Sequence, residues 1–416
     1  MANKEICVSI SLGGNTLPVG RLWTHQGKGK ETASFEYAKS WLEHPERFAL
    51  EPSLNLGSGS FHTRQDTSLF GAFADSAPDR WGRILMRRAH SNLSKEKEQT
   101  SSTLFESDYL LGVCDEARQG ALRFSLPPND DLFLNQTDKN TIPPLIELPK
   151  ILSATENFLE NNDSWSDLKL LLAPGSSLGG ARPKASVRGI DGSLCIAKFP
   201  ARSDDCNTVT WEALALTLAK KAGITTPEWT LKVIADKPIL LLKRFDRNNQ
   251  QRIPFLSAMS MLSAKDNEQH SYLEMAYALN QYGASPKQDL AALWRRIIFS
   301  IMINNTDDHL RNHGFLYEPK KGWRLSPAYD LNPTPTHIKA RVLTTAIDFE
   351  HTEASLDLAL SVAGEFQLKQ TEAMDIIQSV SYATQSWKKE ASRLGLNKNE
   401  CDWMASAFEI SNSDLS

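Results

Sequence analysis

The 416-residue chain has no long apolar run, and this absence argues against a membrane-embedded protein. A membrane-spanning helix needs about 20 consecutive, mostly apolar residues. One of the longest apolar runs, Ile297–Ile303, is far shorter than that and contains a serine. The first residues, MANKEICVSIS, also lack the basic start and the apolar stretch of a signal peptide. We therefore expect a cytoplasmic protein that does not act in a membrane.

Cysteine is scarce, and the cysteines present do not form a recognisable set of metal ligands or disulfide partners. They are Cys7, Cys114, Cys195, Cys206 and Cys401. Their number is odd and no two have the C-x-x-C spacing, which excludes a zinc ribbon and disfavours a disulfide framework. A reducing compartment is the simplest expectation, in agreement with a cytoplasmic location.

Neither sign of charge is in strong excess. The 46 lysine and arginine residues face 50 aspartate and glutamate residues, so the net charge is −4. Apolar residues make up 41% and charged residues 23%, which is typical of a globular chain and not of a disordered one. The length predicts two or three domains. Without a basic excess, the chain is not expected to bind DNA by itself.

A loop-like segment marks the first expected domain boundary. Residues Pro127–Pro144 contain two Pro-Pro pairs and few apolar side chains, which is typical of a linker. Before this segment, strand-like runs at Ile6–Leu12 and Leu17–Trp23 are mixed with helical stretches at Ser34–Leu42 and Asp79–Arg88. The first 126 residues are therefore predicted to form a region that contains both strands and helices.

The middle of the chain predicts a β-hairpin followed by a helix. The dipeptide Asp191-Gly192 suits a tight turn and separates two strand-like runs, Ala185–Ile190 and Ser193–Phe199. The stretch Trp211–Ala222 has apolar residues at helical spacing, and Gly223 follows where a C-terminal cap is expected.

The remainder is predicted to be mostly helical. Ser285 and Pro286 suit the N-cap and the first position of a helix, and Gln288 would complete a capping box. The apolar residues of this helix follow a 3.6-residue period, so we expect it to lie in a core. Further helices are expected at Ser355–Ala363, Thr371–Arg393 and Asn399–Ile410.

The first candidate functional element is a glycine-rich loop, GSSLGGARPK, at Gly175–Lys184. Such a loop lets backbone N–H groups approach a phosphate, and a nearby lysine adds positive charge. It does not match a Walker A loop, because Ala181 stands where that motif has lysine and a hairpin follows in place of a helix. A loop between strands is typical of kinase-type nucleotide loops, although a plain turn would have the same composition.

The second element is Lys198, in the sequence IAKF on the expected second strand of the hairpin. A lysine in a half-buried strand is costly unless it is paired or binds a ligand. Glu212, on the following predicted helix, is the candidate partner, and a strand lysine with a helix glutamate positions ATP phosphates in kinases. The alternative is a lysine on the solvent face of the strand.

The third element is NNTDDHLRN, at Asn304–Asn312. Four residues separate Asp307 from Asn312, as they separate the catalytic aspartate from the metal-binding asparagine of a kinase catalytic loop. Asp330 follows where a second magnesium-binding aspartate is expected. Phosphoryl transfer needs a carboxylate at the attacking hydroxyl and oxygen ligands for magnesium, and this order of residues supplies both.

These motifs resemble those of the HipA-type serine/threonine kinase toxins of bacterial toxin–antitoxin systems. The resemblance rests on GSSLGGARPKA, IAKFP, LLLKRFDR, NNTDDHLRNHGFL and LSPAYDL, at Gly175–Ala185, Ile196–Pro200, Leu240–Arg247, Asn304–Leu316 and Leu325–Leu331. Two further motifs, DSAPDRWGR at Asp75–Arg83 and GALRF at Gly120–Phe124, resemble the accessory N-terminal subdomain of that family.

The resemblance implies an α+β, two-lobed protein-kinase-like fold with an N-terminal accessory α/β subdomain and an all-helical C-terminal lobe. The expected divisions are residues 1–126 for the accessory subdomain, 127–247 for the nucleotide-binding lobe and 248–416 for the catalytic lobe.

The resemblance also implies the roles of individual residues, with ATP and Mg²⁺ as cofactors. Asp307 would be the catalytic aspartate, and Asn312 and Asp330 would hold magnesium. Lys198 would contact the α- and β-phosphates. The further ATP contacts implied are Ser177, Gly179, Gly180 and Lys184 in the glycine-rich loop, Lys243 and Phe245 at the hinge facing adenine, and Asp246 and His309 near the ribose.

Regulation and partners are implied in the same way. Ser177, or Ser176 beside it, would be autophosphorylated. A phosphate there adds about −1.5 to −2 charges where the loop must cradle the phosphates of ATP, so it is expected to silence the kinase. The implied partners are a small helix-turn-helix antitoxin like HipB, operator DNA reached through that antitoxin, and a protein substrate from the translation machinery such as an aminoacyl-tRNA synthetase.

Two other functions stay open at this point. The same catalytic parts serve kinases of small molecules or lipids, and the sequence does not show the acceptor groove. The other function is that of a catalytically silent module that sequesters an antitoxin or DNA. A silent kinase commonly loses one of its catalytic residues, and this chain keeps Asp307, Asn312, Asp330 and Lys198. Asp308, a second carboxylate beside Asp307, would either add metal affinity or face solvent.

Overall fold

The computed structural model describes residues 3–27, 29–96, 98, 102–128, 132–133, 142–172, 180, 182–201, 204–249 and 251–409. The chain divides into two compact units. Unit 1 comprises Met1–Ser203 and Lys232–Leu256, and unit 2 comprises Asp204–Leu231 and Ser257–Ser416. Residues on both sides of the expected boundary at 126/127 lie in unit 1. The division into three regions stays a prediction.

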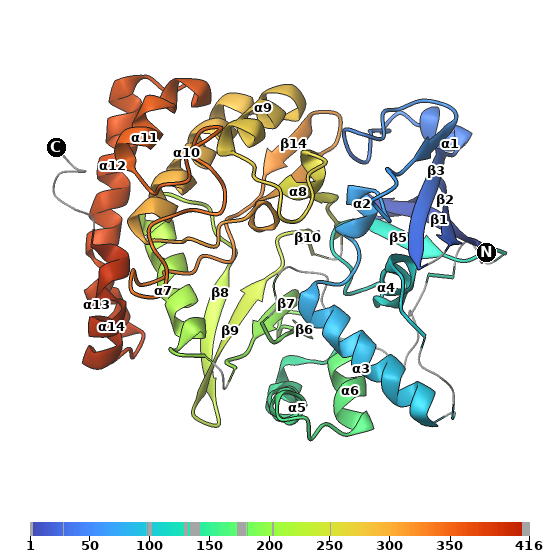
Figure 1. Ribbon diagram of the computed structural model, residues 1–416, viewed down its shortest axis with the longest axis horizontal. Coiled ribbons are helices and arrows are strands. Elements are labelled where there is room, and N and C mark those ends of the chain that lie inside the picture. Colours follow the sequence, from blue (N-terminus) through green and yellow to red (C-terminus); the bar gives the residue numbers. More distant parts are fainter. Residues whose placement is uncertain are drawn as a thin grey trace. The chain divides into compact units, whose positions relative to one another are not determined.

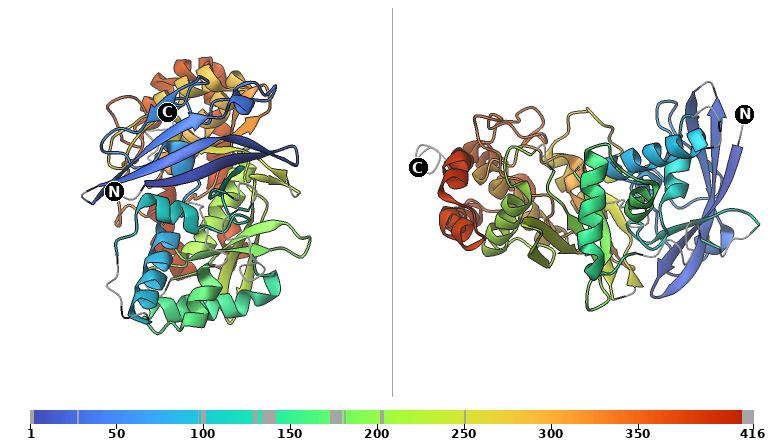
Figure 2. Two further views of the ribbon diagram at one scale, coloured as in Figure 1. Left: turned by 90° about the vertical axis from the view of Figure 1, so that its right-hand side faces the viewer. Right: turned by 90° about the horizontal axis from the view of Figure 1, so that it is seen from below.

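Unit 1 begins with an antiparallel sheet of five strands in the order β4-β3-β2-β1-β5. Its strands are β1 (Asn3–Leu12), β2 (Asn15–Gly27), β3 (Lys30–Tyr37), β4 (Ser60–His62) and β5 (Leu122–Ser125). Figure 2 shows the long, twisted strands of this sheet. The strand-like runs predicted in β1 and β2 are confirmed, and Ile6 pairs with Leu22 in their register.

The helix predicted over Ser34–Leu42 is mostly wrong. Its first half lies in β3, and only Lys39–Leu42 forms a short helix, α1. Phe35 and Tyr37 are both buried, and their rings meet edge to face with centroids 4.9 Å apart. Side chains two residues apart share a face only in a strand, so aromatic packing on one face of the sheet decides this segment.

A second sheet contains the predicted hairpin. Its strands are β6 (Lys184–Arg188), β7 (Leu194–Lys198), β9 (Lys237–Lys243) and β8 (Trp229–Ile234), in the order β6-β7-β9-β8. Strands β6 and β7 are antiparallel and flank the turn at Asp191-Gly192, where Gly192 has a positive φ of 79°. A residue without a Cβ adopts this left-handed conformation without strain. The hairpin prediction is confirmed.

Helices from both sides of the expected boundary share one core in unit 1. The helices are α3 (Arg80–Glu96), α5 (Leu148–Leu159) and α6 (Trp165–Leu172), which lie close together beside β6 and β7 (Figure 1). Trp81 and Leu85 of α3 are buried in this core together with residues of α5, α6, β6, β7 and β9. The rings of Trp81 and Phe158 meet edge to face at 5.3 Å. The accessory residues therefore complete the core that carries the hairpin.

The remaining elements of unit 1 are short. They are α2 (Gly71–Ala74), α4 (Glu106–Gly112), a 3₁₀-helix at Leu145–Glu147, β10 (Arg247–Asn248), β11 (Gln251–Arg252) and the start of β12 (Phe255–Ser257).

Unit 2 is mostly helical, as predicted. Its helices are α7 (Thr208–Lys221), α8 (Ala258–Met261), α9 (Tyr272–Tyr282), α10 (Pro286–Met302), α11 (Leu356–Ser361), α12 (Gln370–Gln385), α13 (Trp387–Arg393) and α14 (Lys398–Phe408), with 3₁₀-helices at Leu310–Asn312 and Ala363–Phe366. It also contains an antiparallel hairpin of β13 (Gly314–Glu318) and β14 (Gly322–Leu325), so the expectation of an all-helical lobe is wrong in this detail.

Helix α10 is central to unit 2 and leads into the predicted catalytic loop. Its apolar side chains, including Trp294 and Ile297, are fully buried, as the 3.6-residue period predicts. The helix begins at Pro286 as expected, but the Ser285 side chain makes no capping hydrogen bond within the described structure. A buried, long helix places the residues that follow Met302 at a fixed point of the unit.

The described residues also bear on two expectations drawn from the composition, which concern membrane-spanning helices and disulfides. None of their helices is both long enough and apolar enough to span a membrane. All five cysteines lie in this part of the chain, and none of them is joined in a disulfide there.

The shared core of unit 1 predicts a large effect of truncating Leu85. The side chain is 0% exposed, and Leu85→Ala should lower the free energy of unfolding by about 2–5 kcal/mol because it leaves a cavity. Urea unfolding followed by tryptophan fluorescence measures this. Arg87→Ala, on the exposed face of the same helix, is the control and should change it by less than about 0.5 kcal/mol. Equal effects of the two substitutions would contradict the packing described.

Candidate active site

The predicted catalytic loop leaves α10 through two asparagines. Asn304 has a left-handed backbone with φ 51°, which asparagine tolerates better than most residues. Its Nδ2 donates to the carbonyl oxygen of Thr334 at 2.6 Å. The Asn305 side-chain oxygen accepts from the backbone N–H of Asn332 at 3.1 Å. These bonds tie the start of the loop to the segment that follows Asp330.

The two adjacent aspartates of the loop have opposite environments. Asp307 is exposed, whereas Asp308 is 3% exposed. The carboxylate of Asp308 accepts hydrogen bonds from the hydroxyl groups of Tyr272 and of Ser300, the latter at 3.0 Å, and lies 2.9 Å from Nε2 of His313. Asp308 therefore does not face solvent, which corrects that expectation, whereas the metal affinity expected as its alternative stays a prediction.

The electrostatics of Asp308 follow from these contacts. Burial alone would raise the pKa of Asp308, but His313, Tyr272 and Ser300 outweigh it and hold the pKa below its ordinary value. Burial and the neighbouring carboxylate together raise the pKa of Tyr272 well above its usual range. Asp308 is thus an ionised support of the loop, and Thr345 fixes its backbone carbonyl with a hydrogen bond of 2.6 Å.

Asn312 lies directly against Asp307. Its Nδ2 donates to the backbone carbonyl of Asp307 at 2.9 Å, which orients the amide. The side chain is buried, and its Oδ1 has no hydrogen-bond partner among the residues that the structure describes. A buried amide oxygen without a partner is costly unless it binds a ligand, and such oxygens are ligands that Mg²⁺ prefers.

Asp330 lies in a segment of unit 2 that is hydrogen-bonded to the predicted catalytic loop. It has a left-handed backbone with φ 57°, an uncommon conformation outside glycine that concentrates at functional sites. The preceding residue, Tyr329, donates its hydroxyl to the carbonyl of Arg311 in the catalytic loop at 2.8 Å. The structure therefore joins the segments that carry Asp307, Asn312 and Asp330, although they are separated in the sequence.

His309 is the fourth predicted residue of this loop. Its backbone N–H donates to the Asp307 carbonyl at 3.0 Å, and its ring is half-buried. The ring atom Nδ1 is buried without a hydrogen-bond partner in the described part of the chain. This atom could hydrogen-bond a hydroxyl group, and the predicted ribose contact stays a prediction.

In unit 1, the two predicted phosphate-binding lysines are cross-strand neighbours. Lys184, the first residue of β6, pairs in register with Lys198, the last residue of β7. Lys198 is half-buried. The side chain of Lys184 is 2% exposed, and its Nζ lies 2.8 Å from the carboxylate of Asp79. Asp79 would therefore compete with a phosphate group for Lys184, and the phosphate contact of Lys184 stays a prediction.

Most of the glycine-rich loop lies outside the described residues. Ser176, Ser177 and Gly179 are among the residues not described, so their predicted roles stay predictions. Gly180 is described, and its carbonyl oxygen accepts from Lys184 Nζ at 3.2 Å.

The hinge motif of unit 1 carries the next predicted contacts. Lys243 is half-buried, and its Nζ lies 3.7 Å from the carboxylate of Asp191 in the hairpin turn. The ring of Phe245 packs against that of Phe255 at 6.3 Å. Both residues lie at or just beyond the end of β9, and their contact with adenine stays a prediction.

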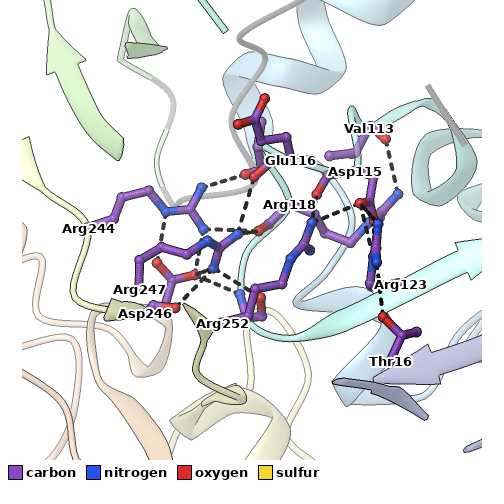
Figure 3. Close-up of polar contacts among 12 residues, drawn as sticks. Thr16, Val113, Asp115, Glu116, Arg118, Arg123, Arg244, Asp246, Arg247 and Arg252 are labelled. Atoms are coloured by element: carbon purple, nitrogen blue, oxygen red, sulfur yellow. Dashed lines mark hydrogen bonds and ion pairs between the residues drawn. The ribbon is translucent and has the colours of Figure 1, made fainter. Parts of the chain in front are cut away.

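Asp246 lies in a buried cluster of charges (Figure 3). Its carboxylate accepts from Nε of Arg244 at 2.8 Å, from Nη1 of Arg247 at 2.8 Å and from the backbone N–H of Gly120 at 2.7 Å. The side chain is 2% exposed. Both of its oxygens accept from these donors, and the ribose contact predicted for Asp246 stays a prediction. The structure makes it a support of the hinge.

The arginines of this cluster also hold the accessory loop that follows α4. Arg244 donates to the carbonyls of Ala117 at 2.6 Å and of Arg118 at 3.0 Å, and Arg247 donates to the same Arg118 carbonyl at 2.6 Å. Figure 3 shows these side chains directed at the loop. Charged donors to backbone carbonyls are among the stronger hydrogen bonds in proteins. The hinge is thus fixed by residues of the accessory region.

Sequence reasoning missed the supporting residues Tyr272, Thr345 and Asp79. The first two are far from Asp308 in the chain and have no motif of their own. Asp79 did carry a signal, because it stands just before the helix that begins at Arg80, where aspartate commonly caps. Nothing in the sequence indicates that the second carboxylate oxygen of Asp79 binds Lys184.

Comparison with known proteins adds to this geometry. The model of the HipA-like C-terminal domain matches residues 176–387, and that of the HipA N-terminal domain matches residues 11–107. The chain is 25% identical over 211 residues to "Putative kinase Y4dM" of Sinorhizobium fredii, covering 46% of this chain and 51% of that protein. It is 28% identical over 150 residues to "Putative kinase" of Haemophilus influenzae, covering 32% and 44%. The matches thus span about half the length of these curated relatives.

A solved structure resembles the whole chain. It is the structure of HipA from Shewanella oneidensis MR-1, in a complex of the toxin–antitoxin proteins HipA and HipB with their operator DNA. The TM-score is 0.65 at 16% sequence identity, and the match covers 96% of this chain and 95% of that one. The two chains share their α+β fold, as the motifs predicted.

The charge cluster predicts a pH-dependent stability. Burial would raise the pKa of Asp246, but Arg244 and Arg247 hold it well below the ordinary value. A carboxylate with a lowered folded-state pKa stabilises the fold fully above about pH 4, and this contribution is lost as the pH falls further. Asp246→Asn should lower the free energy of unfolding at pH 7 by about 3–5 kcal/mol, because it breaks a buried ion pair.

Urea unfolding at pH 7 and between pH 5 and pH 3 measures this effect. The difference between the wild type and Asp246→Asn should shrink below about pH 4. Glu5→Gln, in the exposed pair with Arg21, is the control and should cost less than about 1 kcal/mol at pH 7. A difference between the wild type and Asp246→Asn that does not change with pH would contradict the assignment.

Proposed function

The chain belongs to the HipA family, and from this membership and its catalytic loop we propose that it is an ATP- and magnesium-dependent serine/threonine protein kinase. We propose further that it is the toxin of a toxin–antitoxin pair. One observation carries the enzymatic part: Asp307 has an exposed carboxylate, and its backbone carbonyl is held by the buried amide of Asn312, whose Oδ1 has no partner among the described residues. A silent module would have no need of this arrangement.

In the proposed mechanism, Asp307 accepts the hydrogen bond of the attacking hydroxyl and takes up its proton. The exposed position of its carboxylate leaves it accessible to an acceptor side chain. Its backbone is held by the amide of Asn312 and by the N–H of His309, and the neighbouring Asp308 is anchored in the core. A base on a rigid support is already oriented before the reaction, so little conformational entropy is lost in the transition state.

Asn312 and Asp330 would hold the magnesium ion. The donor set fits, since an unpartnered amide oxygen and a carboxylate are hard oxygen ligands and phosphate oxygens would complete the coordination. When bound, the ion neutralises charge on the transferred phosphate. The left-handed backbone of Asp330 and the Tyr329–Arg311 hydrogen bond orient the second ligand.

The remaining contacts proposed for ATP come from Lys198, from the hinge and from His309. Lys198 would contact the α- and β-phosphates, and the backbone at Lys243 and Phe245 would face adenine. The unpartnered Nδ1 of His309 would bind a ribose hydroxyl. Ser177, or Ser176, would receive the autoinhibitory phosphate.

The proposed partners follow from the family. The solved HipA of Shewanella oneidensis is bound to HipB and operator DNA, which supports a small helix-turn-helix antitoxin as the partner of this chain. The net charge of −4 agrees with DNA contact through that partner. A protein of the translation machinery, such as an aminoacyl-tRNA synthetase, is the first substrate to test.

The catalytic assignment predicts that Asp307→Asn lowers phosphoryl transfer by about 10²–10⁴-fold, because the substitution removes the base from the attacking hydroxyl. Nucleotide binding should persist. Incorporation of labelled phosphate from Mg-ATP into the protein and into candidate substrates measures the effect. Asp402→Asn, an exposed aspartate of α14, is the matched control and should retain activity. The proposal fails if Asp307→Asn is as active as the control, or if the wild type transfers no phosphate.

A further inference from the structure

Lys339 lies beside the proposed catalytic base, although it belongs to the segment that follows Asp330. We propose that Lys339 is a further catalytic residue, whose ammonium group contacts the phosphoryl group while it is transferred at Asp307. The inference rests on the proposed function and adds to it a residue outside the motifs that resemble the HipA family. Lys339 and the catalytic loop both belong to unit 2.

The backbone of Lys339 is fixed at the start of the catalytic loop. Its carbonyl oxygen accepts from Nδ2 of Asn304 at 3.3 Å, and its N–H donates to the carbonyl of Pro335 at 3.2 Å. In the same segment, the N–H of Thr334 donates to the carbonyl of Asn304 at 3.2 Å. These bonds hold residues 334–339 against the point where the loop leaves α10.

The side chain of Lys339 is directed at the residue before the base. Its Nζ donates to the carbonyl oxygen of Thr306 at 3.3 Å, and Asp307 follows directly. The same oxygen accepts from the backbone N–H of Thr344 at 3.1 Å and from its Oγ1 at 2.8 Å. A carbonyl oxygen has two lone pairs, and Thr344 supplies donors for both. The loop backbone therefore does not need Lys339 for its support.

The charge of Lys339 is not neutralised within the part of the chain that the structure describes. The residue is exposed, and no described carboxylate forms an ion pair with it. An ammonium group has three N–H donors, and the bond to Thr306 uses one of them. By contrast, Arg311 of the catalytic loop is paired with Asp266 at 2.7 Å. Lys339 is thus a charged group that is held at the loop and keeps two donors for a ligand.

The proposed reaction needs such a cation next to Asp307. The oxygen of the attacking hydroxyl forms a bond to the γ-phosphorus and passes its proton to Asp307. The bond from this phosphorus to the bridging oxygen breaks, and its electron pair stays on the leaving diphosphate. Lys339 exchanges no proton in this step. Negative charge on the transferred group is stabilised by a cation already in place.

The reach of the side chain agrees with this role. Consecutive Cα atoms are about 3.8 Å apart, so a group held at Thr306 is close to a ligand at Asp307. Lysine carries a point charge on a flexible stem, which lets it follow the phosphoryl group from donor to acceptor.

The test separates the charge of Lys339 from its hydrogen bond. Lys339→Gln removes the charge and keeps an amide that can donate to Thr306, whereas Lys339→Arg keeps the charge. Lys389→Gln, at an exposed lysine of α13, is the matched control. Single-turnover reactions use γ-labelled Mg-ATP, excess protein that circular dichroism shows to be folded, and dephosphorylated casein as a serine-rich acceptor. They measure the label that passes to water, to casein and to the protein itself.

Lys339→Gln should slow the transfer to all three acceptors by about 10²-fold, because it removes charge stabilisation in the transition state. Lys339→Arg should stay within about tenfold of the wild type, and Lys389→Gln within about twofold. Calorimetric titration with a non-hydrolysable ATP analogue and Mg²⁺ should give a Kd for Lys339→Gln within about threefold of the wild-type value, since the contact forms during transfer.

The inference is overturned if Lys339→Gln is as active as Lys389→Gln. It is also overturned if Lys339→Gln and Lys339→Arg lose activity equally, which would show a structural role, or if transfer to casein falls while transfer to water is unchanged, which would place Lys339 at the acceptor. These results leave the proposed function intact. If the wild type passes label to none of the three acceptors, the proposed function fails and takes the inference with it.

Discussion

A carboxylate that leaves water must be paired, and this constraint separates three supporting aspartates from the two that are proposed to act in catalysis. Asp79, Asp246 and Asp308 are buried, and their oxygens are occupied by arginine, lysine, histidine, hydroxyl or backbone donors. Asp307 is exposed, and Asp330 is only half-buried. The contrast is sharpest at Asp307 and Asp308, because these adjacent residues of one motif have opposite environments.

In unit 1 the same constraint joins the accessory region to the elements that are proposed to bind nucleotide. Arg244 and Asp246 of the hinge bind the loop at Ala117–Gly120, and Lys184 of the hairpin binds Asp79. Trp81 completes the hydrophobic core on which the hairpin lies. A region that the sequence marks off by a proline-rich linker is thus joined by buried charges to the elements that are proposed to bind ATP.

The sequence predicted most of the local structure and the spacing of the proposed catalytic residues. Asp307, Asn312 and Asp330 form a pattern because one loop and one short segment carry them. It could not predict that Asp308 is buried, because its partners Tyr272 and His313 are recognisable only after the chain folds. It did not predict the buried charge cluster around Asp246. The segment of β3 was mistaken for a helix because its aromatic packing depends on neighbouring strands.

The central claim is that Asn312 holds the catalytic metal while Asp308 only supports the loop. Mn²⁺ can replace Mg²⁺ at oxygen sites, and its electron paramagnetic resonance signal reports its binding in the presence of a non-hydrolysable ATP analogue. The account predicts that Asn312→Ala abolishes the ternary complex of protein, nucleotide and metal, whereas folded Asp308→Asn retains it. A complex that survives Asn312→Ala, or one that is lost from folded Asp308→Asn, would contradict the account.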